Sequence, residues 1–386
     1  MIEVRVSRKA ADRVASGHPW IFSSDVVSAE GASSGIAVRV IDPRGRALGV
    51  AHYSSSSQIS LRMLSGAVKE IDRAFFLERI AAAFSHRRSV VRDTDAYRLV
   101  HAEGDLLPAL IVDRYADYVV MQTLDQGMDS ARDTIASCLA ELLAPAAIVA
   151  RNDAAVRDRE ALPRETSVLS GEVPAAVAVR MNGITFHADL VGGQKTGIYL
   201  DQRENYLAAA RYAHGHALDC FTSSGGFALH MAAKCESVEA ADSSAAALAL
   251  AEKNRQANNA ANVEFRQADA FELLAGYAAQ RRKFSTVVLD PPAFAKSRKN
   301  LDGAIRGYKE INLRALQLLE RGGILVTCSC SHHVSEAALL ELVAEASLDA
   351  RRTVRVLERR TQAQDHPILL TVPETHYLKC LILQVM

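Results

Sequence analysis

Two cysteines stand close together at the end of an apolar run in the last third of the chain. The run covers residues 322–327 and continues into Cys328, Ser329 and Cys330. A cysteine at the carboxyl end of a strand can serve as a nucleophile when part of its thiol is ionised, although most buried cysteines simply fill a core. Alternate residues of a strand face the same side, so the spacing alone does not choose between Cys328 and Cys330.

Three aspartates mark the ends of the apolar runs that come before these cysteines. Asp219, Asp242 and Asp269 each stand at or near the end of a strand-like segment. A single acidic residue in that position is more commonly a helix N-cap. Three in succession, on consecutive strand–helix units, predict a ligand site at the carboxyl ends of the strands. We expect Asp242 to accept hydrogen bonds from ribose hydroxyls and Asp269 to lie at an adenine edge.

A loop of small residues follows the first of these aspartates. Residues 217–227 read ALDCFTSSGGF, where an apolar strand ends and a helix begins after Gly226. Glycines in such a loop let the backbone approach a ligand closely. The loop matches neither GxGxxG nor a P-loop, so a pyrophosphate or triphosphate ligand is disfavoured. The pattern predicts an adenosine that carries a non-phosphate substituent.

A rigid stretch follows the next apolar run, where residues 290–294 read DPPAF. Two prolines fix the φ angles of the backbone. Such a loop can hold the Asp290 carboxylate and backbone carbonyls against a flat heterocycle, and Phe294 could stack on it. The alternative is a plain turn that ends a strand.

The elements that position these residues are predicted by an alternation that starts at His216. Apolar runs alternate there with helical stretches rich in alanine and leucine, which predicts a doubly wound α/β sheet. The strands are expected at residues 217–221, 237–241, 263–266, 286–289 and 324–327.

The preceding part of the chain has a different pattern. Residues 1–70 read as short strands and turns of a small β-barrel or sandwich, and residues 71–188 as a central α+β domain. Within the latter we expect helices at 71–88 and 128–143, strands at 118–122 and 147–151, and a hairpin about Asn182-Gly183. The polar residues 152–164 are expected to form an exposed connector. The expected domains are therefore 1–70, 71–188 and 189–386.

The charge balance limits the classes of partner. Lys and Arg number 45, as do Asp and Glu, so the formal net charge of the 386 residues is zero. A neutral total argues against a protein that coats nucleic acid indiscriminately. Local basic clusters could still contact RNA, or could be solvated loop charges; they are Arg281, Arg282 and Lys283, then Lys296, Arg298 and Lys299.

The six cysteines form no CxxC pair, so neither a zinc site nor a disulfide framework is indicated. Residues 1–13 carry charges along their length and lack the apolar core of a signal peptide. No uninterrupted apolar run approaches membrane-spanning length. We expect a cytoplasmic protein with reduced thiols, no metal and no membrane partner.

Many separated motifs in one order point to a known family. They are residues 17–22 (GHPWIF), Gly49, Tyr53 and Ser54, residues 97–100, 103–105, 107–108 and 113–115, residues 195–203 (KTGIYLDQR), residues 306–309 (RGYK), 329–331 (SCS), 365–367 (DHP) and 377–379 (YLK). Over nearly its whole length the chain resembles the bacterial large-subunit ribosomal RNA methyltransferases that form 5-methylcytosine.

The resemblance implies an N-terminal PUA domain, a small central domain and a C-terminal Rossmann-like class I methyltransferase domain. It implies S-adenosylmethionine as cofactor and Cys330, in the SCS triplet, as the catalytic cysteine. Thr327-Cys328-Ser329 also resembles the TCS motif of other RNA cytosine methyltransferases. The resemblance further suggests a homodimer. The expected cofactor-binding residues are Lys195, Tyr199, Arg203, Phe221, Gly225, Asp242, Asp269, Asp290 and Pro291.

The implied reaction starts from a thiolate that adds to carbon 6 of cytosine, with Asp290 holding N3 of the base. The base must leave any stack to reach the site, so we expect a single-stranded or opened segment of ribosomal RNA as partner. Two alternatives stay open. Methylation of a guanine nitrogen would use a similar DPP stretch and no cysteine, and a non-catalytic RNA-binding assembly factor would need no cofactor.

Overall fold

The computed structural model describes residues 1–193, 196–294 and 301–386. The chain folds into two compact units. The first unit comprises Met1–Val179, Ala188–Ile198 and Gln364–Thr375, and the second comprises Arg180–His187, Tyr199–Ala363 and His376–Met386. Within the described residues, no helix is both long and apolar enough to cross a membrane.

The N-terminal part of the first unit is a six-stranded sheet in the order β2-β6-β5-β4-β1-β3. Alternate residues such as Val4, Val6, Val38 and Val40 are buried in its core, as the two-residue period of a strand dictates. The helix α1 (Arg8–Ala15) begins at Ser7, whose hydroxyl accepts a hydrogen bond from the Ala10 amide. The strands are β1 (Glu3–Val6), β2 (Trp20–Phe22), β3 (Val26–Ser28), β4 (Ala37–Ile41), β5 (Ala47–Tyr53) and β6 (Ile59–Ser65).

A second sheet follows, with the strand order β11-β10-β9-β8-β7. Its strands are β7 (Ala96–His101), β8 (Leu110–Tyr115), β9 (Tyr118–Thr123), β10 (Ala147–Asn152) and β11 (Glu165–Gly171). The expected helix at 71–88 is α2 (Arg73–Val90). The helix expected at 128–143 is present as α4 (Arg132–Leu143), but its expected first residues belong to a separate short helix, α3 (Gln126–Ser130).

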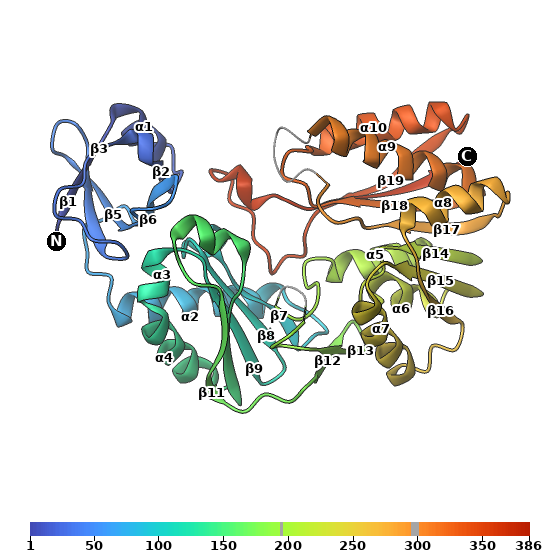
Figure 1. Cartoon of the computed structure of the whole chain (residues 1–386), viewed down its shortest axis with the longest axis horizontal. Helices are drawn as coiled ribbons and strands as arrows, with labels where there is room; N and C mark the ends of the chain where they lie inside the picture. The colour runs from blue at the N-terminus through green and yellow to red at the C-terminus, as the bar shows by residue number, and fades with distance from the viewer. Residues whose placement is uncertain (194–195, 295–300) are drawn as a thin grey trace. The chain divides into compact units, whose positions relative to one another are not determined.

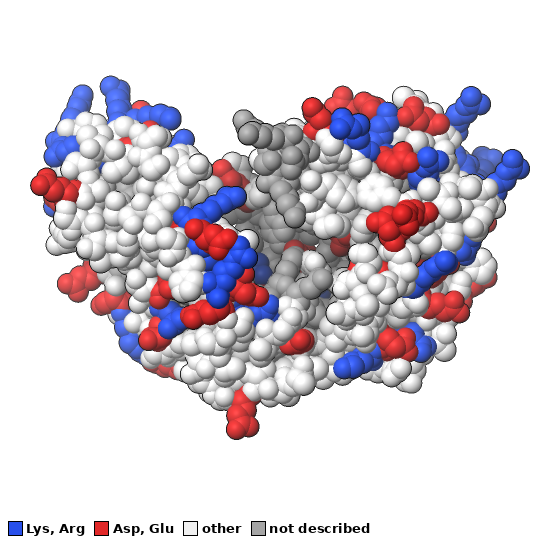
Figure 2. Space-filling view, in the orientation of Figure 1, with Lys and Arg blue, Asp and Glu red and all other residues white. Residues whose placement is uncertain are grey.

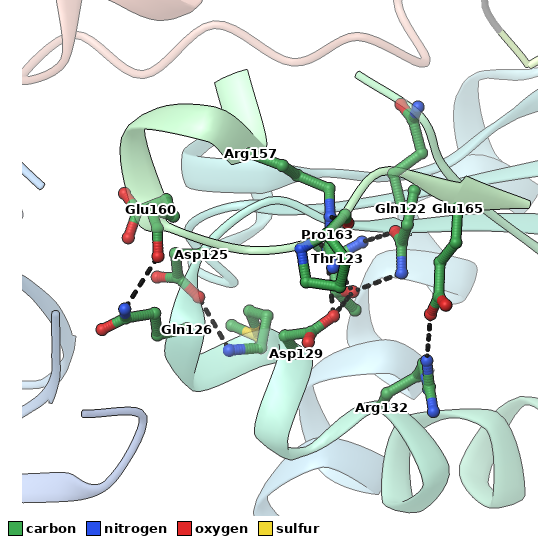
Figure 3. Close-up of polar contacts among 12 residues, drawn as sticks. Gln122, Thr123, Asp125, Gln126, Asp129, Arg132, Arg157, Glu160, Pro163 and Glu165 are labelled. Carbon is green, nitrogen blue, oxygen red and sulfur yellow. Dashed lines mark hydrogen bonds and ion pairs between the residues drawn. The ribbon is translucent and has the colours of Figure 1, made fainter. Parts of the chain in front are cut away.

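The polar residues 152–164 connect β10 to β11 and most of them are exposed, as expected, but the segment also includes buried residues. Arg157 and Asn152 are fully buried. Figure 3 shows Arg157 directed into a cluster of polar groups, where Nη1 donates to Asp129 Oδ1 at 2.8 Å and to the Thr123 carbonyl, and Nε donates to Pro163 O at 2.8 Å. The charged side chain is buried because these acceptors replace its water.

Another buried set of charges ties a distant segment to the first unit. Arg87 is 1% exposed and its guanidinium pairs with both carboxylate oxygens of Asp105. Its Nη2 also donates to Asp365 O at 2.8 Å, and Asp365 Oδ2 accepts from the Arg98 amide at 2.9 Å. The DHP segment is therefore held by the residues of the first unit.

A two-stranded sheet joins β12 (Val177–Met181) to β13 (Ile184–Ala188), which confirms the expected hairpin. Asn182 and Gly183 have φ angles of 53° and 80°. Both turn positions need positive φ, which these two residue types tolerate best.

The second unit is a doubly wound sheet of seven strands in the order β16-β15-β14-β17-β18-β20-β19. The first five strands of that order are mutually parallel, whereas β20 runs antiparallel to both of its neighbours. The strands are β14 (His216–Cys220), β15 (Ser237–Asp242), β16 (Val263–Gln267), β17 (Phe284–Leu289), β18 (Leu319–Ser329), β19 (Val354–Arg360) and β20 (Lys379–Val385). The five strands expected from the apolar runs are all present.

Helices cover both faces of this sheet (Figure 1). They are α5 (Arg203–Tyr212), α6 (Gly226–Ala232), α7 (Ala245–Ala257), α8 (Ala270–Ala279), α9 (Leu301–Leu318) and α10 (Glu336–Asp349). Side chains of α8, α9 and α10 form one core with β17, β18 and β20, in which Leu316, Leu325 and Leu339 are fully buried. This core supports the strand ends at which the sequence predicts chemistry.

The buried arginine of the first unit yields a stability prediction. Arg157→Met should lower the free energy of unfolding by about 2–3 kcal/mol, because Asp129 and the Thr123 carbonyl lose their donor. Arg159→Met is the matched control, since Arg159 is exposed two residues away. Urea unfolding followed by circular dichroism measures both. Equal midpoints for the two variants would contradict a stabilising role for the Arg157 cluster.

Candidate active site

The site is built on the carboxyl ends of parallel strands. Cys220, the last residue of β14, pairs with Ala241 of β15 on one side and with Leu289 of β17 on the other. The next backbone bonds continue this pattern, from Thr222 N to Ala241 O at 3.0 Å and from Asp290 N to Cys220 O at 3.4 Å. The loops after these three strands therefore begin side by side, as in other α/β sheets with a ligand at this edge.

The loop after β14 has an unusual backbone. Phe221, Ser223 and Gly225 have φ angles of 66°, 50° and 88°. The left-handed region is costly for Phe and Ser, and such strain concentrates at functional loops. Asp242 accepts the Ser223 amide on Oδ2 at 2.9 Å and so holds the loop in this conformation.

The helix α6, which follows this loop, begins at two glycines where neighbouring side chains leave little space for a Cβ atom. A Cβ atom added to Gly226 would lie 2.3 Å from Cζ of Tyr206, so only glycine fits there. A Cβ atom added to Gly225 would lie 3.1 Å from Cζ of the Phe265 ring, so a larger residue has little room there. The glycine pair thus allows α6 to begin in close contact with α5.

Asp219 lies beneath the loop, and the sequence assigned it no ligand contact of its own. Its side chain is buried, and Oδ2 accepts from Thr222 Oγ1 at 2.6 Å and from Ala228 N at 3.1 Å. Among the described residues, Oδ1 has no hydrogen-bond partner. Burial raises the pKa of Asp219 to about 7, and the charges of Asp290 and Asp242 add to that effect. A buried oxygen of this kind can accept a hydrogen bond from a cationic ligand.

Asp269 makes the contacts of a helix cap. Its Oδ1 accepts from Phe271 N at 2.9 Å and from Glu272 N at 3.1 Å at the start of α8, and the residue is exposed. This geometry is the alternative that a lone acidic strand end always allows. A contact with adenine stays a prediction.

The DPP stretch is tied to the residues just before α5. Gln202 Nε2 donates to Asp290 Oδ1 at 3.0 Å, and Gln202 Oε1 accepts from Asn205 Nδ2 at 2.7 Å. Gln202 stands in the motif at residues 195–203, but the sequence assigns it no role, because its partner Asp290 is far along the chain. Pro291 is buried and Pro292 is exposed.

Tyr199 and Arg203 come from the same segment. Tyr199 is partly buried, and burial together with the charges of Asp290, Asp201 and Cys330 raises its pKa. Tyr199 therefore stays neutral near Asp290 and Cys330 at physiological pH. Arg203 is 2% exposed at the start of α5, 3.7 Å from Glu204. The expected cofactor residue Lys195 lies outside the described residues.

The two cysteines at the end of β18 differ in environment. Cys328 lies within the strand opposite Cys380 of β20 and is fully buried, which raises the pKa of its thiol. The strand ends at Ser329, so the alternation that would turn Cys330 to the same side does not continue. Cys330 is partly exposed, and its Sγ lies 3.9 Å from Pro291 O. The other five cysteines are buried.

Aromatic side chains gather next to these loops. The ring of Phe294 lies 4.8 Å from that of Tyr308, 5.7 Å from Phe271 and 6.5 Å from Phe221. Tyr308 in turn contacts Ser329 and Ser331, which flank Cys330, at 3.0 Å each. The aromatic group thus links the DPP stretch, the β14 loop and the end of β18.

The basic clusters expected as RNA contacts fall into two cases. Arg282 pairs with Glu239 at 3.0 Å and stacks 4.0 Å from the Tyr277 ring, and Lys283 donates to Gln317 O at 2.8 Å. These residues precede β17, so they lie at the amino ends of the parallel strands, whereas Asp290 lies at the carboxyl ends. Lys296, Arg298 and Lys299 lie outside the described residues. Figure 2 shows Lys and Arg interspersed with Asp and Glu on the visible face.

Models of two protein families match the chain. One, described as a PUA-like domain, matches residues 4–66, and another, described as a methyltransferase domain, matches residues 213–369.

Among the described residues, no group of three or more His, Cys, Asp or Glu could hold a metal ion.

Solved structures support the fold. A protein assigned as a methyltransferase and solved in complex with SAH aligns over 100% of both chains with a TM-score of 0.87 and 19% identity. A Streptococcus mutans protein assigned as a SAM-dependent methyltransferase aligns over 100% of both chains with a TM-score of 0.85 and 19% identity. The expected fold class, a PUA-like N-terminal domain and a Rossmann-like methyltransferase domain, is confirmed.

Curated relatives are similar over nearly the full length. The ribosomal RNA large subunit methyltransferase I of Shewanella amazonensis is 43% identical over 377 residues, and that of Tolumonas auensis is 41% identical over 377 residues. Each alignment covers 95% of this chain and 95% of the relative. This extent of identity shows that the chain belongs to the ribosomal RNA large subunit methyltransferase I family.

Proposed function

We propose that the protein methylates carbon 5 of a cytosine in large-subunit ribosomal RNA, with S-adenosylmethionine as donor and Cys330 as nucleophile. The observation that carries the proposal is the partly exposed Cys330 thiol, 3.9 Å from the carbonyl of Pro291 in the DPP stretch. Ribosomal RNA is the substrate in the names of the relatives, and a solved structural neighbour holds SAH. The PUA-like domain supports binding of the flanking RNA.

The residues at the strand ends fit the cofactor. The unpartnered Oδ1 of Asp219 would accept a hydrogen bond from its ammonium group, and Asp242 would bind the ribose. The glycine pair Gly225-Gly226 lets the backbone approach it closely. Further contacts are assigned to Tyr199, Arg203, Phe221, Asp269, Asp290, Pro291 and Lys195. When bound, S-adenosylmethionine supplies a methyl group made electrophilic by a positively charged sulfur.

Cys330 makes carbon 5 reactive. Carbon 5 of cytosine is a weak nucleophile, but a bond between the Cys330 sulfur and carbon 6 moves ring electrons onto carbon 5. After carbon 5 has gained the methyl group, a base removes its proton and the carbon–sulfur bond breaks to release the thiolate. The thiolate is thereby regenerated for the next cycle.

Asp290 holds the base during this step. Gln202 donates to Oδ1 of Asp290, and a proton on this carboxyl can be shared with N3 of cytosine. Such a hydrogen bond stabilises the negative charge that develops on the ring when sulfur adds. The base reaches these groups only outside a helix stack, so the substrate is a single-stranded or opened segment.

The nucleophile is tested by two matched cysteine variants. Cys330→Ala should keep affinity for S-adenosylmethionine in calorimetric titration and lose turnover by ~10⁴-fold or more. Cys328→Ala is the control, because Cys328 is buried against Cys380 and should keep activity. Methylated ribosomal RNA is digested and its nucleosides identified by mass spectrometry.

Two outcomes would overturn the assignment. Full activity of Cys330→Ala with loss in Cys328→Ala would move the nucleophile to Cys328. A methylated guanosine in place of 5-methylcytidine would replace the reaction with methylation of a guanine nitrogen, which needs no thiol.

The cofactor assignment of Asp219 predicts a pH dependence. Its raised pKa of about 7 means that the carboxyl is mostly protonated below that pH, and only the ionised form pairs with an ammonium group. Affinity for S-adenosylmethionine should therefore rise about tenfold between pH 5.5 and pH 7. Asp219→Asn should bind more weakly at pH 7 and lose most of this rise, whereas the exposed Asp269→Asn should keep it. The same slope in Asp219→Asn and in the unmodified protein would refute the contact.

A further inference from the structure

A lysine is buried beside the segment that carries Cys330. Lys379 is the first residue of β20 and is 3% exposed. Its Nζ donates to Ser331 O at 2.8 Å and to Tyr377 O at 3.0 Å. Among the described residues, no carboxylate lies within ion-pair distance of this ammonium group. Lysine is rarely buried without an acidic partner, because its charge loses hydration.

Lys379 holds the backbone on both sides of Cys330. Its Cα pairs with that of Ser329, the residue before Cys330, across the β18–β20 ladder. Its side chain then reaches to the carbonyl of Ser331, the residue after Cys330. The nucleophile proposed above is therefore fixed between two contacts with one lysine.

We propose that Lys379 is a positioning residue that orients Cys330 and supplies the positive charge that stabilises its thiolate. The inference rests on the proposed role of Cys330. A cation beside a cysteine lowers the pKa of the thiol, and the thiolate is the nucleophilic form. The two charges influence each other here: burial lowers the pKa of Lys379 to about 8, and the negative charge of Cys330 opposes that effect.

Other titratable groups face Cys330 from the neighbouring elements. In its ionised form Asp290, whose neighbour Pro291 contacts Cys330, opposes ionisation of the thiol. Tyr199 and Tyr308 have raised pKa values, mainly through burial, and are neutral near pH 8. His332, two residues after Cys330 in the chain, is exposed. Lys379 is thus a buried cation at the end of β18 that can offset the charge of an ionised Asp290.

The sign of the pH dependence follows from these groups. Lys379 carries its charge below about pH 8 and loses it above that pH. Stabilisation of the thiolate is therefore present at neutral pH and fades in alkaline solution. Removal of the ammonium group should raise the thiol pKa of Cys330 and leave the reactivity of the full thiolate at high pH unchanged.

The test measures the thiol directly and needs no RNA. Alkylation of the full chain by iodoacetamide is followed from pH 5.5 to 10, with the Cys330 peptide quantified by mass spectrometry. The other five cysteines are buried and serve as internal controls for unfolding. Lys379→Met and Lys379→Gln should slow alkylation at pH 7 about tenfold, because a rise of one unit in the thiol pKa of Cys330 lowers the thiolate fraction by that factor. Glutamine keeps a donor for Ser331 O, so an equal effect in both variants would identify charge as the cause.

Matched variants separate this role from a structural one. Lys379→Arg keeps the charge and should retain a low thiol pKa. Lys309→Met is the control, since Lys309 of α9 pairs with Glu345 and Asp349 of α10. Circular dichroism and affinity for S-adenosylmethionine report folding.

Two results would overturn the inference. One is an unchanged alkylation profile in folded Lys379→Met and Lys379→Gln. The other is a thiol pKa of Cys330 at or above the unperturbed value of about 8.5 in the unmodified protein, which decides the matter even if the neutral variants fail to fold. If the thiol pKa of Cys330 is low and depends on Lys379, but Cys330→Ala stays active, the inference about the thiol holds. The proposed function, which makes Cys330 the nucleophile, is then wrong.

Discussion

The parallel register of four strands is the constraint on which the site depends. Backbone hydrogen bonds align Cys220 with Ala241 and with Leu289, and align Leu289 with Thr327. The residues that follow each of these positions begin at the same edge of the sheet. Main-chain geometry therefore brings together the β14 loop, Asp242, the DPP stretch and the segment with Cys328 and Cys330. A shift of one residue would turn each side chain to the other face.

The antiparallel strand β20 gives the two cysteines different environments. It pairs Cys328 with Cys380 and Ser329 with Lys379, so Cys328 is enclosed between neighbouring strands. Beyond Ser329 the ladder stops, and Cys330 lies beside the Pro291 carbonyl. The Ser329 hydroxyl before it donates to Tyr308, and the Ser331 carbonyl after it accepts from Lys379. The Cys328 thiol is thus enclosed in the core, whereas the Cys330 thiol is partly exposed.

The sequence was most informative where local pattern decides structure. Apolar runs predicted β14 to β18, and Asn182-Gly183 predicted a hairpin, because strand period and turn φ angles depend on adjacent residues. The burial of Arg157 within residues 152–164 was missed because composition does not reveal that Arg157 finds acceptors at Thr123 and Asp129. Gln202 and Lys379 stand in motifs that carry the resemblance but were given no role for the same reason, since their partners lie far along the chain. Spacing alone also left the two cysteines equivalent, because it does not tell where β18 ends.

A covalent bond between Cys330 and the target base tests the central claim most directly. Fluorine at carbon 5 of cytosine cannot leave as a proton does, so an RNA substrate with 5-fluorocytidine should trap the methylated adduct. We predict a protein–RNA complex stable in denaturant, dependent on S-adenosylmethionine, with the nucleotide mass on the peptide that contains Cys330. Methylation of ordinary RNA without any trapped complex, or a complex joined through Cys328, would contradict the account.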